Sequence, residues 1–421
     1  MDARIQELVD FTKIKFGLGN YYLKEYQFYR RVNIFNETIY TLSMEWLPND
    51  IERDEGDLNP EGAASIEINL KNRKFEKVIF VKGKSYAENG VMFNNRENII
   101  KWLENETGLT YGEQFQLKKE EKEEFLFQGC VKGVPLYPPS FIEIHINEDR
   151  KLTQYSIYGE FPYKEQIKEE KYSLSLEGLQ HLYREQLKLI EYPSFEQKKI
   201  YPIYAIEEIF STNDGKSIIP YEVLFAEKSN LLEINQTICW DEPLNIPFER
   251  KRMNWVEDIT AEQAFSAKPS PDSFPITEEE QEKCTMAVEK LLRQEYPNET
   301  GKWVLIILHR EKGYIHAILR AKKQDELVFQ RKIRVFIDSE SFQAVNYMDS
   351  KPMLETFDDF QAPDVVTITK EEAYEILKER FELTPYYVYN FKQGQYHLCG
   401  KLDCQYGVNA STGEVIALNE L

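Results

Sequence analysis

The sequence predicts an α+β protein made of tandem copies, each a helix packed on a small antiparallel sheet, arranged in two halves. Three observations indicate this fold. A pattern of two apolar strands joined by a polar turn occurs five times, helical patterns precede most copies, and one proline-rich stretch interrupts the series. Because 421 residues are too many for one ordinary hydrophobic core, several packing units are expected.

Each copy consists of an alternating strand, a short polar turn and a second apolar strand. In the first copy, Ile66, Ile68 and Leu70 precede the turn, and Val78 and Ile79 follow it. The five copies start at Ile66, Ile142, Glu222, Ile333 and Tyr406. They lie about 75 residues apart, except that one interval is about thirty residues longer. Alternation gives each sheet one apolar face, which a helix can cover.

Apolar residues at spacings of three and four predict the first three helices. We expect them from Ile5 to Phe16, around Ile99 to Leu103 with an end at Gly108, and from Leu176 to Ile190, before Pro193. A unit of this size has a limited core, so neighbouring copies should share apolar surface within each half.

Capping boxes predict where the fourth and fifth helices begin. In Thr277-Glu278-Glu279-Glu280 and Thr369-Lys370-Glu371-Glu372, the threonine hydroxyl and the last carboxylate can each accept a backbone N–H bond. Helices are therefore expected to start directly after Thr277 and Thr369.

The long interval coincides with the proline-rich residues 241–275, and prolines interrupt both helices and strands. The prolines are Pro243, Pro247, Pro269, Pro271 and Pro275. We predict an N-terminal half over residues 1–240 with about three copies, a linker or insertion over 241–275, and a C-terminal half over 276–421. The C-terminal half holds the last two copies, the final one over residues 365–421.

The most specific motif is the final hairpin, Tyr406-Gly407-Val408-Asn409-Ala410-Ser411-Thr412-Gly413-Glu414-Val415-Ile416. It resembles the closing hairpin of a PepSY domain, in which a strand ends on an acidic or amide residue and Ala, a polar residue, Thr and Gly follow. Gly413 can supply the positive φ of such a turn, and the side chains of Asn409 and Thr412 can cap it. The sequence departs from the family at Asn409, where Asp is usual.

The tandem layout is similar to that of the YcdB/YcdC repeated-domain family of PepSY-like proteins, known mainly from spore-forming bacteria. PepSY domains, of the peptidase-propeptide and YPEB types, occur in propeptides of thermolysin-type peptidases and in proteins tied to spore or cell-wall hydrolases. The resemblance therefore implies a bacterial protein that restrains a peptidase or holds another protein partner. It implies no catalytic, cofactor-binding or metal-binding residue, and we assign none.

The composition disfavours several classes of partner. The chain has 52 basic and 72 acidic side chains and a formal charge of −20, which repels nucleic-acid phosphates and anionic membrane surfaces. The N-terminal residues lack a secretory signal pattern, and no apolar run approaches the roughly 18 residues that cross a bilayer. The five cysteines are odd in number and scattered, which favours free thiols in a reducing, cytoplasmic compartment.

Few residues suggest chemistry. His397, Cys399 and Cys404 place three soft ligands close together in the sequence, but a structural zinc site needs a fourth, so buried thiols are the favoured interpretation. Glu257 and Asp258 could act as the acid and base of a glycosidase, although solvated surface better explains a pair in so acidic a chain.

Other motifs also have ordinary explanations. Gly17-Leu18-Gly19 lacks the third glycine and the preceding strand of a phosphate loop. Tyr386-Tyr387-Val388-Tyr389 fits half-buried sheet packing better than a partner surface. The histidines His145, His181, His309 and His316 lie away from any nucleophile motif. Neither Gly-x-Ser-x-Gly nor His-Glu-x-x-His occurs, although a catalytic triad could still be assembled from distant residues.

Three functions follow from these patterns. The favoured one is non-catalytic binding, in which exposed sheet edges or concave faces hold a protein such as a peptidase. A second is a hydrolase that uses carboxylates gathered between the halves. A third is a structural protein that self-associates through unpaired strand edges.

Overall fold

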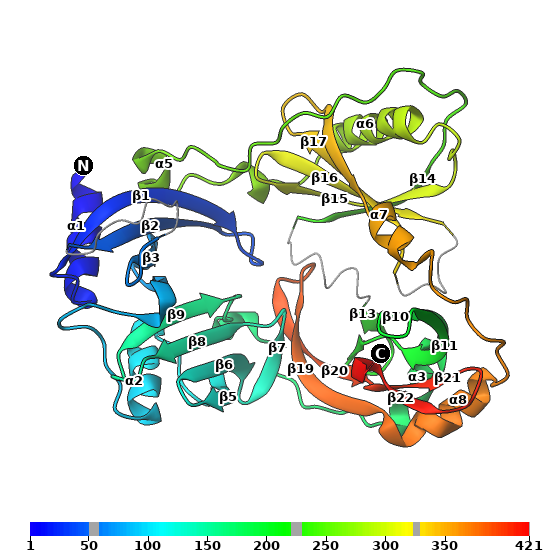
Figure 1. Ribbon diagram of the computed structural model, residues 1–421, viewed down its shortest axis with the longest axis horizontal. Coiled ribbons are helices and arrows are strands. Elements are labelled where there is room, and N and C mark those ends of the chain that lie inside the picture. Colours follow the sequence, from blue (N-terminus) through cyan, green and yellow to red (C-terminus); the bar gives the residue numbers. More distant parts are fainter. Residues whose placement is uncertain (50–58, 220–229, 323–328, 421) are drawn as a thin grey trace. The chain divides into compact units, whose positions relative to one another are not determined.

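The structure is a computed structural model that describes residues 1–49, 59–219, 230–322 and 329–420 (Figure 1). It confirms the α+β class, because helices alternate along the chain with mainly antiparallel strands. The chain divides into two compact units. Compact unit 1 comprises Met1–Glu169, Glu257–Ser270 and Tyr386–His397, and compact unit 2 comprises Glu170–Val256, Pro271–Pro385 and Leu398–Leu421. The domain boundaries inferred from the sequence stay a prediction.

Compact unit 1 contains two successive groups of one helix followed by strands. The first group is α1 (Ala3–Lys15), β1 (Tyr21–Val32), β2 (Thr38–Pro48), β3 (Ala64–Asn69) and β4 (Phe75–Phe80). The second is α2 (Arg96–Thr107), β5 (Phe115–Glu121), β6 (Glu124–Val131), β7 (Val134–Tyr137), β8 (Phe141–Ile146) and β9 (Leu152–Tyr158). The strands are ordered β1-β2-β3-β4-β9-β8-β6-β7, and β5 pairs with β6. The first two predicted hairpins are thereby confirmed as β3–β4 and β8–β9.

One hydrophobic core serves both groups of compact unit 1. Ile5 of α1 and Leu103 of α2 are buried in the same cluster as Trp46 and Ile66 from the sheet. The short helix α5 (Ala261–Phe265) adds Ala264, which is also buried there. Part of the predicted linker therefore packs as core, and the predicted sharing of apolar surface between the first two copies is confirmed.

Compact unit 2 contains three further groups of strands, again with helices. The first group is α3 (Gln180–Gln186), β10 (Leu187–Ser194), β11 (Lys199–Ile206), β12 (Ile209–Thr212) and β13 (Ile218–Ile219). The second is β14 (Leu232–Ile238), α6 (Glu278–Glu295), β15 (Trp303–Glu311), β16 (Tyr314–Ala321), β17 (Lys332–Asp338), β18 (Ala344–Asp349) and α7 (Lys351–Leu354). The third is α8 (Lys370–Leu377), β21 (Tyr406–Asn409) and β22 (Val415–Ala417).

Each of the last two boundaries between the compact units, Pro385/Tyr386 and His397/Leu398, falls within a strand. The two strands are β19 (Glu382–Asn390) and β20 (Gln395–Asp403). In compact unit 1, Tyr387 and Val388 of β19 pair in parallel with Leu136 and Tyr137 of β7. In compact unit 2, the C-terminal part of β20 pairs with β12, and β12 pairs with β13. Short 3-10 helices complete the fold: η1 (Val81–Gly83), η2 (Lys164–Gln166), η3 (Glu177–Leu179), η4 (Pro271–Ser273), η5 (Glu355–Phe357), η6 (Lys378–Arg380) and η7 (Leu418–Glu420).

The helices of compact unit 2 cover two sheets. Helix α6 packs on the sheet β14-β15-β16-β17-β18, where Val288 and Leu292 are fully buried with Trp303 and Leu305 (Figure 1). Helices α3 and α8 share another core with β10, β11 and β21, whose sheet order is β10-β11-β21-β22. The third predicted copy therefore packs with the fifth, which the sequence places beyond the predicted linker.

The third predicted helix was too long. Helix α3 ends at Gln186, and Leu187 begins strand β10. Leu187 pairs with Ile206 of β11, and Ile190 pairs with Ile203. Strand pairing with a distant segment satisfies these backbone groups, and a short apolar run does not by itself distinguish that outcome from a helix.

Two of the remaining three hairpins are observed, and the third lies partly outside the described residues. The fourth and fifth are confirmed as β17–β18 and β21–β22. The first strand of the third, with Tyr221, Val223 and Phe225, lies outside the described residues. Its predicted second strand belongs to β14, which pairs with β15.

The closing turn has the hydrogen bonds that the sequence predicts. The side chain of Asn409 accepts bonds from the backbone N–H groups of Ser411 (2.9 Å) and Thr412 (3.2 Å). The Thr412 hydroxyl accepts from the N–H of Glu414 at 3.3 Å, and Gly413 has a φ of 78°. Local sequence is sufficient for this turn because every bond joins residues at most three apart.

Both predicted capping boxes are confirmed. The Thr277 hydroxyl accepts from the Glu280 N–H at 3.3 Å, and the Glu280 carboxylate accepts from the Thr277 N–H at 2.9 Å. Thr369 and Glu372 make the same pair of bonds at the start of α8.

Replacing Thr277 by alanine should destabilise the first turn of α6 by about 1 kcal/mol, because one backbone N–H loses its acceptor. Native-state hydrogen exchange of the α6 amides measures this loss. Thr277→Ser keeps the hydroxyl and should retain most of the protection. Equal protection in the alanine and serine variants would mean that the capping bond contributes little.

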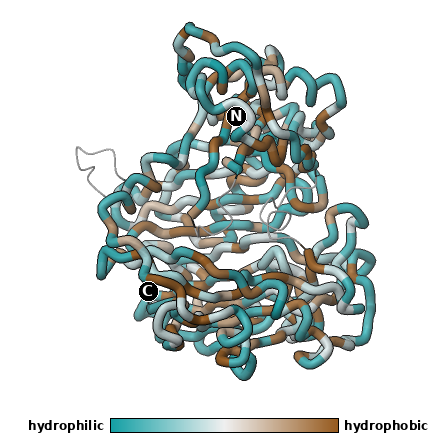
Figure 2. Tube along the Cα trace, turned by 90° about the vertical axis from the view of Figure 1, so that its right-hand side faces the viewer, coloured by the Kyte–Doolittle hydropathy of each residue, from teal (hydrophilic) through white to brown (hydrophobic). Residues whose placement is uncertain are grey.

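No helix within the described residues is both long enough and apolar enough to cross a membrane. Along the tube in Figure 2, hydrophobic stretches are short and are interrupted by hydrophilic residues.

Candidate functional site

The hairpin β15–β16 brings together three potential metal ligands that are separated in the sequence. Its turn is Lys312-Gly313, and both residues have positive φ, 51° and 79°. Such two-residue turns match the twist of the strands and determine which residues pair. Glu311 consequently lies opposite Tyr314, and His309 lies opposite His316.

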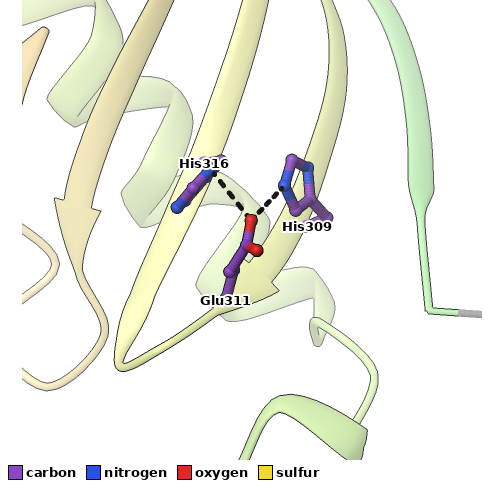
Figure 3. Close-up of side chains that lie close together, drawn as sticks. All are labelled: His309, Glu311 and His316. Carbon is purple, nitrogen blue, oxygen red and sulfur yellow. Dashed lines mark ion pairs between the residues drawn. The ribbon is translucent and has the colours of Figure 1, made fainter. Parts of the chain in front are cut away.

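The two imidazoles face the same carboxylate oxygen. Nε2 of His309 and Nδ1 of His316 each lie 3.6 Å from Oε2 of Glu311. The two rings are 4.7 Å apart between centroids and are tilted by 51°. One potential ligand atom from each residue fits within a mutual distance of 4.8 Å. Figure 3 shows the two imidazoles on either side of the Glu311 carboxylate.

The opposite face of the hairpin belongs to the core under α6. Leu308, Ile315 and Ala317 are fully buried in the cluster that contains the α6 residues. Successive strand residues point to opposite faces, so the histidines point away from this core. Arg310 points to the same face as the core residues, and its guanidinium pairs with Glu280 of α6 at 2.6 Å. It is therefore directed away from the Glu311 carboxylate, which lies on the other face.

Aromatic rings line the face that carries the histidines. Phe336, which lies opposite His316 on β17, is 5.0 Å from it between ring centroids. Trp255 lies 6.1 Å from His316, 5.6 Å from Phe336 and 5.5 Å from Tyr314. The side chains of His309 and His316 are 12% and 3% exposed, whereas that of Glu311 is 38% exposed. The cluster is therefore buried on the imidazole side and open on the carboxylate side.

The donor set is two imidazole nitrogens and one carboxylate oxygen. Imidazole suits zinc, copper, iron and nickel, whereas calcium and magnesium prefer oxygen ligands alone. Within the described part of the chain, His309, Glu311 and His316 form the group of at least three His, Cys, Asp or Glu side chains whose ligand atoms are close enough to hold one metal ion. No linear motif joins the three residues, so the sequence by itself does not indicate this group. Strand alternation between His309 and Glu311, followed by a two-residue turn, was the signal that could have revealed it.

The structure places Cys399 and Cys404 as buried free thiols, which is the favoured interpretation of the sequence. Burial raises the pKa of the Cys399 thiol to about 12 and also raises the pKa of Cys404. Thiols that stay protonated are poor nucleophiles and poor metal ligands. Cys399 lies on β20 opposite Thr212 of β12, and His397 is two residues before it on the same strand.

The carboxylate pair suggested for a glycosidase is partly engaged in an ion pair. Glu257 accepts two hydrogen bonds from the guanidinium of Arg30, at 2.7 and 3.2 Å. These bonds join residues far apart in the sequence and hold the Glu257 segment against strand β1 in compact unit 1. The ion pair with Arg30 gives Glu257 a structural role in holding this segment on β1.

Tyr387 and Tyr389 of β19 pack against other side chains and are not exposed to solvent. Tyr387 and Tyr389 are 8% and 6% exposed, and Tyr389 contacts the rings of Phe35 and Tyr396 at 5.4 and 5.1 Å. The segment serves sheet packing, as the sequence favours, but Tyr387, Val388 and Tyr389 are buried in succession, so it is covered on both faces and is not half-buried.

Strand β1 forms a second candidate surface. It ends the sheet of compact unit 1 and, within the described residues, pairs with β2 alone (Figure 1). A bulge follows Leu23, after which the pairing runs without interruption from Glu25 to Val32. Tyr26 and Tyr29 are 37% and 50% exposed along this edge. Because they are three residues apart, they lie on opposite faces of the sheet.

Comparisons with known proteins identify no family. No protein-family model matches the sequence, and no curated protein matches it. Among solved structures, the chain is similar to the C-terminal domain of YpeB from Bacillus megaterium, with 9% sequence identity and a TM-score of 0.25 over 82% of this chain and 96% of that one. A TM-score this low supports no conclusion about fold or function, so the PepSY resemblance rests on the sequence motif.

Proposed function

We propose that this chain is a non-catalytic binding protein that holds an extended segment of another protein along strand β1. The observation that carries the proposal is the continuous edge from Glu25 to Val32. An edge strand offers a row of backbone donors and acceptors to which a peptide can add as a further strand. Backbone bonds supply affinity in this mode, and side chains beside the edge supply specificity.

Two tyrosines are placed to contact such a segment. Tyr26 lies on the face of Met44, and Tyr29 lies on the face of Thr41, so an added strand would have one phenol ring against each side. The formal charge of −20 favours a segment rich in lysine and arginine, because opposite charge speeds encounter and stabilises the complex. The PepSY resemblance makes a peptidase the expected owner of that segment.

Selection of random peptides displayed on phage tests the proposal with the purified full chain. Selected peptides should be basic and should bind the double variant Tyr26→Ala/Tyr29→Ala at least about tenfold more weakly, since exposed aromatic contacts commonly contribute more than 1 kcal/mol each. Tyr158→Ala is the matched control. Tyr158 is 49% exposed but lies on β9, in the middle of the same sheet.

Hydrogen exchange of the complex should show added protection at those amides of residues 25–32 that point away from β2, because the alternate amides already bond to β2. Peptides that bind the double variant and the Tyr158→Ala control equally would refute the role of β1. A dimer in light scattering that dissociates in the double variant would instead favour the self-associating alternative.

A further inference from the structure

We propose that His309, Glu311 and His316 form a binding site for one divalent transition-metal ion, with Zn²⁺ as the ion that the donor set fits best. The site lies in compact unit 2 and shares no residue with the proposed peptide-binding edge of β1 in compact unit 1. Five observations support it: the convergence of the ligands, the rigidity of the hairpin, the aromatic wall formed by Trp255 and Phe336, the type of donor atoms and the opening beside Glu311.

The spacing is close to that of a metal site. Ligand atoms about 2.0–2.1 Å from a tetrahedral zinc ion lie roughly 3.3–3.4 Å from one another. The two nitrogen-to-oxygen distances here are both 3.6 Å, and they meet at the single atom Oε2 of Glu311. All three potential ligand atoms lie within 4.8 Å of one another, so we expect rotation of the side chains to bring them to bonding distance.

The backbone holds these side chains in register. His309 and His316 face each other across two hydrogen-bonded strands, and Glu311 is two residues from His309 on the same face. The positive φ values of Lys312 and Gly313 define the tight turn that sets this pairing. The Lys312 N–H also donates to the Asp272 carboxylate at 2.8 Å, which ties the turn to η4. Ordering the ligands on binding therefore costs little conformational entropy.

The aromatic wall orients the deeper ligand. Phe336 and Trp255 pack beside His316, whose side chain is 3% exposed. A backbone bond from Asn254 N–H to the Tyr314 hydroxyl at 3.0 Å holds the Trp255 segment over this face. An apolar wall lowers the local dielectric and strengthens the attraction between a cation and the Glu311 carboxylate.

The donor set selects the ion and leaves room for a further ligand. Two neutral imidazoles and one carboxylate suit zinc, and three protein ligands leave at least one coordination position for water or an anion. The opening lies beside Glu311, the most exposed of the three side chains. One carboxylate compensates half of the double charge of the ion, so a small anion is the expected additional ligand.

Titration of the metal-free full chain tests the proposal. Isothermal titration with Zn²⁺ should give one ion per chain, and Co²⁺ should produce the visible absorption bands of a low-symmetry nitrogen and oxygen site. His309→Gln and Glu311→Gln should each weaken Zn²⁺ binding by at least about 100-fold, because removing a direct ligand should cost more than the 10–100-fold typical of outer-shell changes.

His145→Gln is the matched control. Nε2 of His145 lies 2.8 Å from Glu143, and Nδ1 lies 3.9 Å from Glu124, so this site has histidine and carboxylates but one imidazole only. The variant should bind Zn²⁺ like the parent. Metal-free variants should unfold at the parent's temperature, and Zn²⁺ should raise that temperature in the parent and in His145→Gln alone.

Absence of binding for both ions, or an affinity that His309→Gln and Glu311→Gln leave unchanged, would overturn the metal site. Because Tyr26→Ala/Tyr29→Ala leaves all three ligands intact, failure of the peptide experiment would not affect this result.

Discussion

Arg331→Met should lower the stability of the sheet β14–β18 by about 3 kcal/mol, the lower end of the cost of removing one partner from a buried ion pair, because this pair is largely but not fully buried. The Arg331 guanidinium donates to Asp349 at 2.8 and 3.3 Å and to Glu299 at 3.3 Å. It also lies over the Trp303 ring at 4.9 Å. The side chains of Arg331 and Asp349 are 15% and 11% exposed, so solvent screens the pair only weakly.

The pH dependence distinguishes this ion pair from simple packing. Burial by itself would raise the pKa of Asp349, but hydrogen bonds from Arg331 and Tyr296 outweigh burial and lower this pKa below its ordinary value. A carboxyl whose folded pKa is lowered stabilises the protein above its unfolded pKa, about 3.9, and this stabilisation is lost as the pH falls through the folded pKa. The difference between parent and variant should thus be largest near neutral pH and should shrink below about pH 4.

Native-state hydrogen exchange of the β17 and β18 amides measures the effect without requiring the whole chain to unfold in one step. Arg334→Met is the control, because Arg334 is an exposed residue of β17, the strand that begins directly after Arg331. Similar losses in both variants, or a difference that does not change with pH, would contradict the importance of the ion pair.

Gly17→Ala should destabilise compact unit 1 by about 3 kcal/mol, whereas Gly19→Ala should change stability by less than about 0.5 kcal/mol. Gly17 has a φ of 66°, and a Cβ atom there would lie 2.5 Å from the carbonyl carbon of Asn89 and 2.9 Å from the Gly90 nitrogen. Both are backbone atoms, so no side-chain rotation can relieve the clash. A Cβ atom at Gly19 would meet nothing within 4 Å.

Hydrogen exchange of the α1 amides in the two glycine variants provides the comparison. The neighbours Phe16 and Leu18 are 1% and 0% exposed, so movement of Gly17 would disturb the core directly. Equal effects at the two glycines would show that the segment can shift to accept a side chain. A larger loss in Gly17→Ala than in Gly19→Ala would also explain the segment Gly17-Leu18-Gly19 by close packing instead of phosphate binding.

The sequence predicted the local elements well where their bonds join nearby residues. The caps at Thr277 and Thr369 and the closing turn at Asn409 are observed with the expected donors and acceptors. The prediction was wrong at Leu187–Ile190, because these residues pair with β11 and do not continue the helix. Their apolar spacing fits either state, and the distant strand decides between them.

The candidate metal site shows the same limit more sharply. The two histidines and the glutamate are evident in the sequence. Whether His309, Glu311 and His316 converge, however, depends on the length of the turn between the two strands. Shifting the pairing by one residue would move His316 to the core face. A site that depends on register in this way has no linear motif.

The amino-acid pattern alone established the α+β class, four of the hairpins, the helix caps and the final turn, because alternation and capping act over a few residues. Tertiary structure decided that α1, α2 and α5 share one core and that α3 packs with α8. It also decided that Ile203 of β11 pairs with Asn409 of β21. Apolar faces and free strand edges are similar in many segments, and only their fit in three dimensions selects which of them meet.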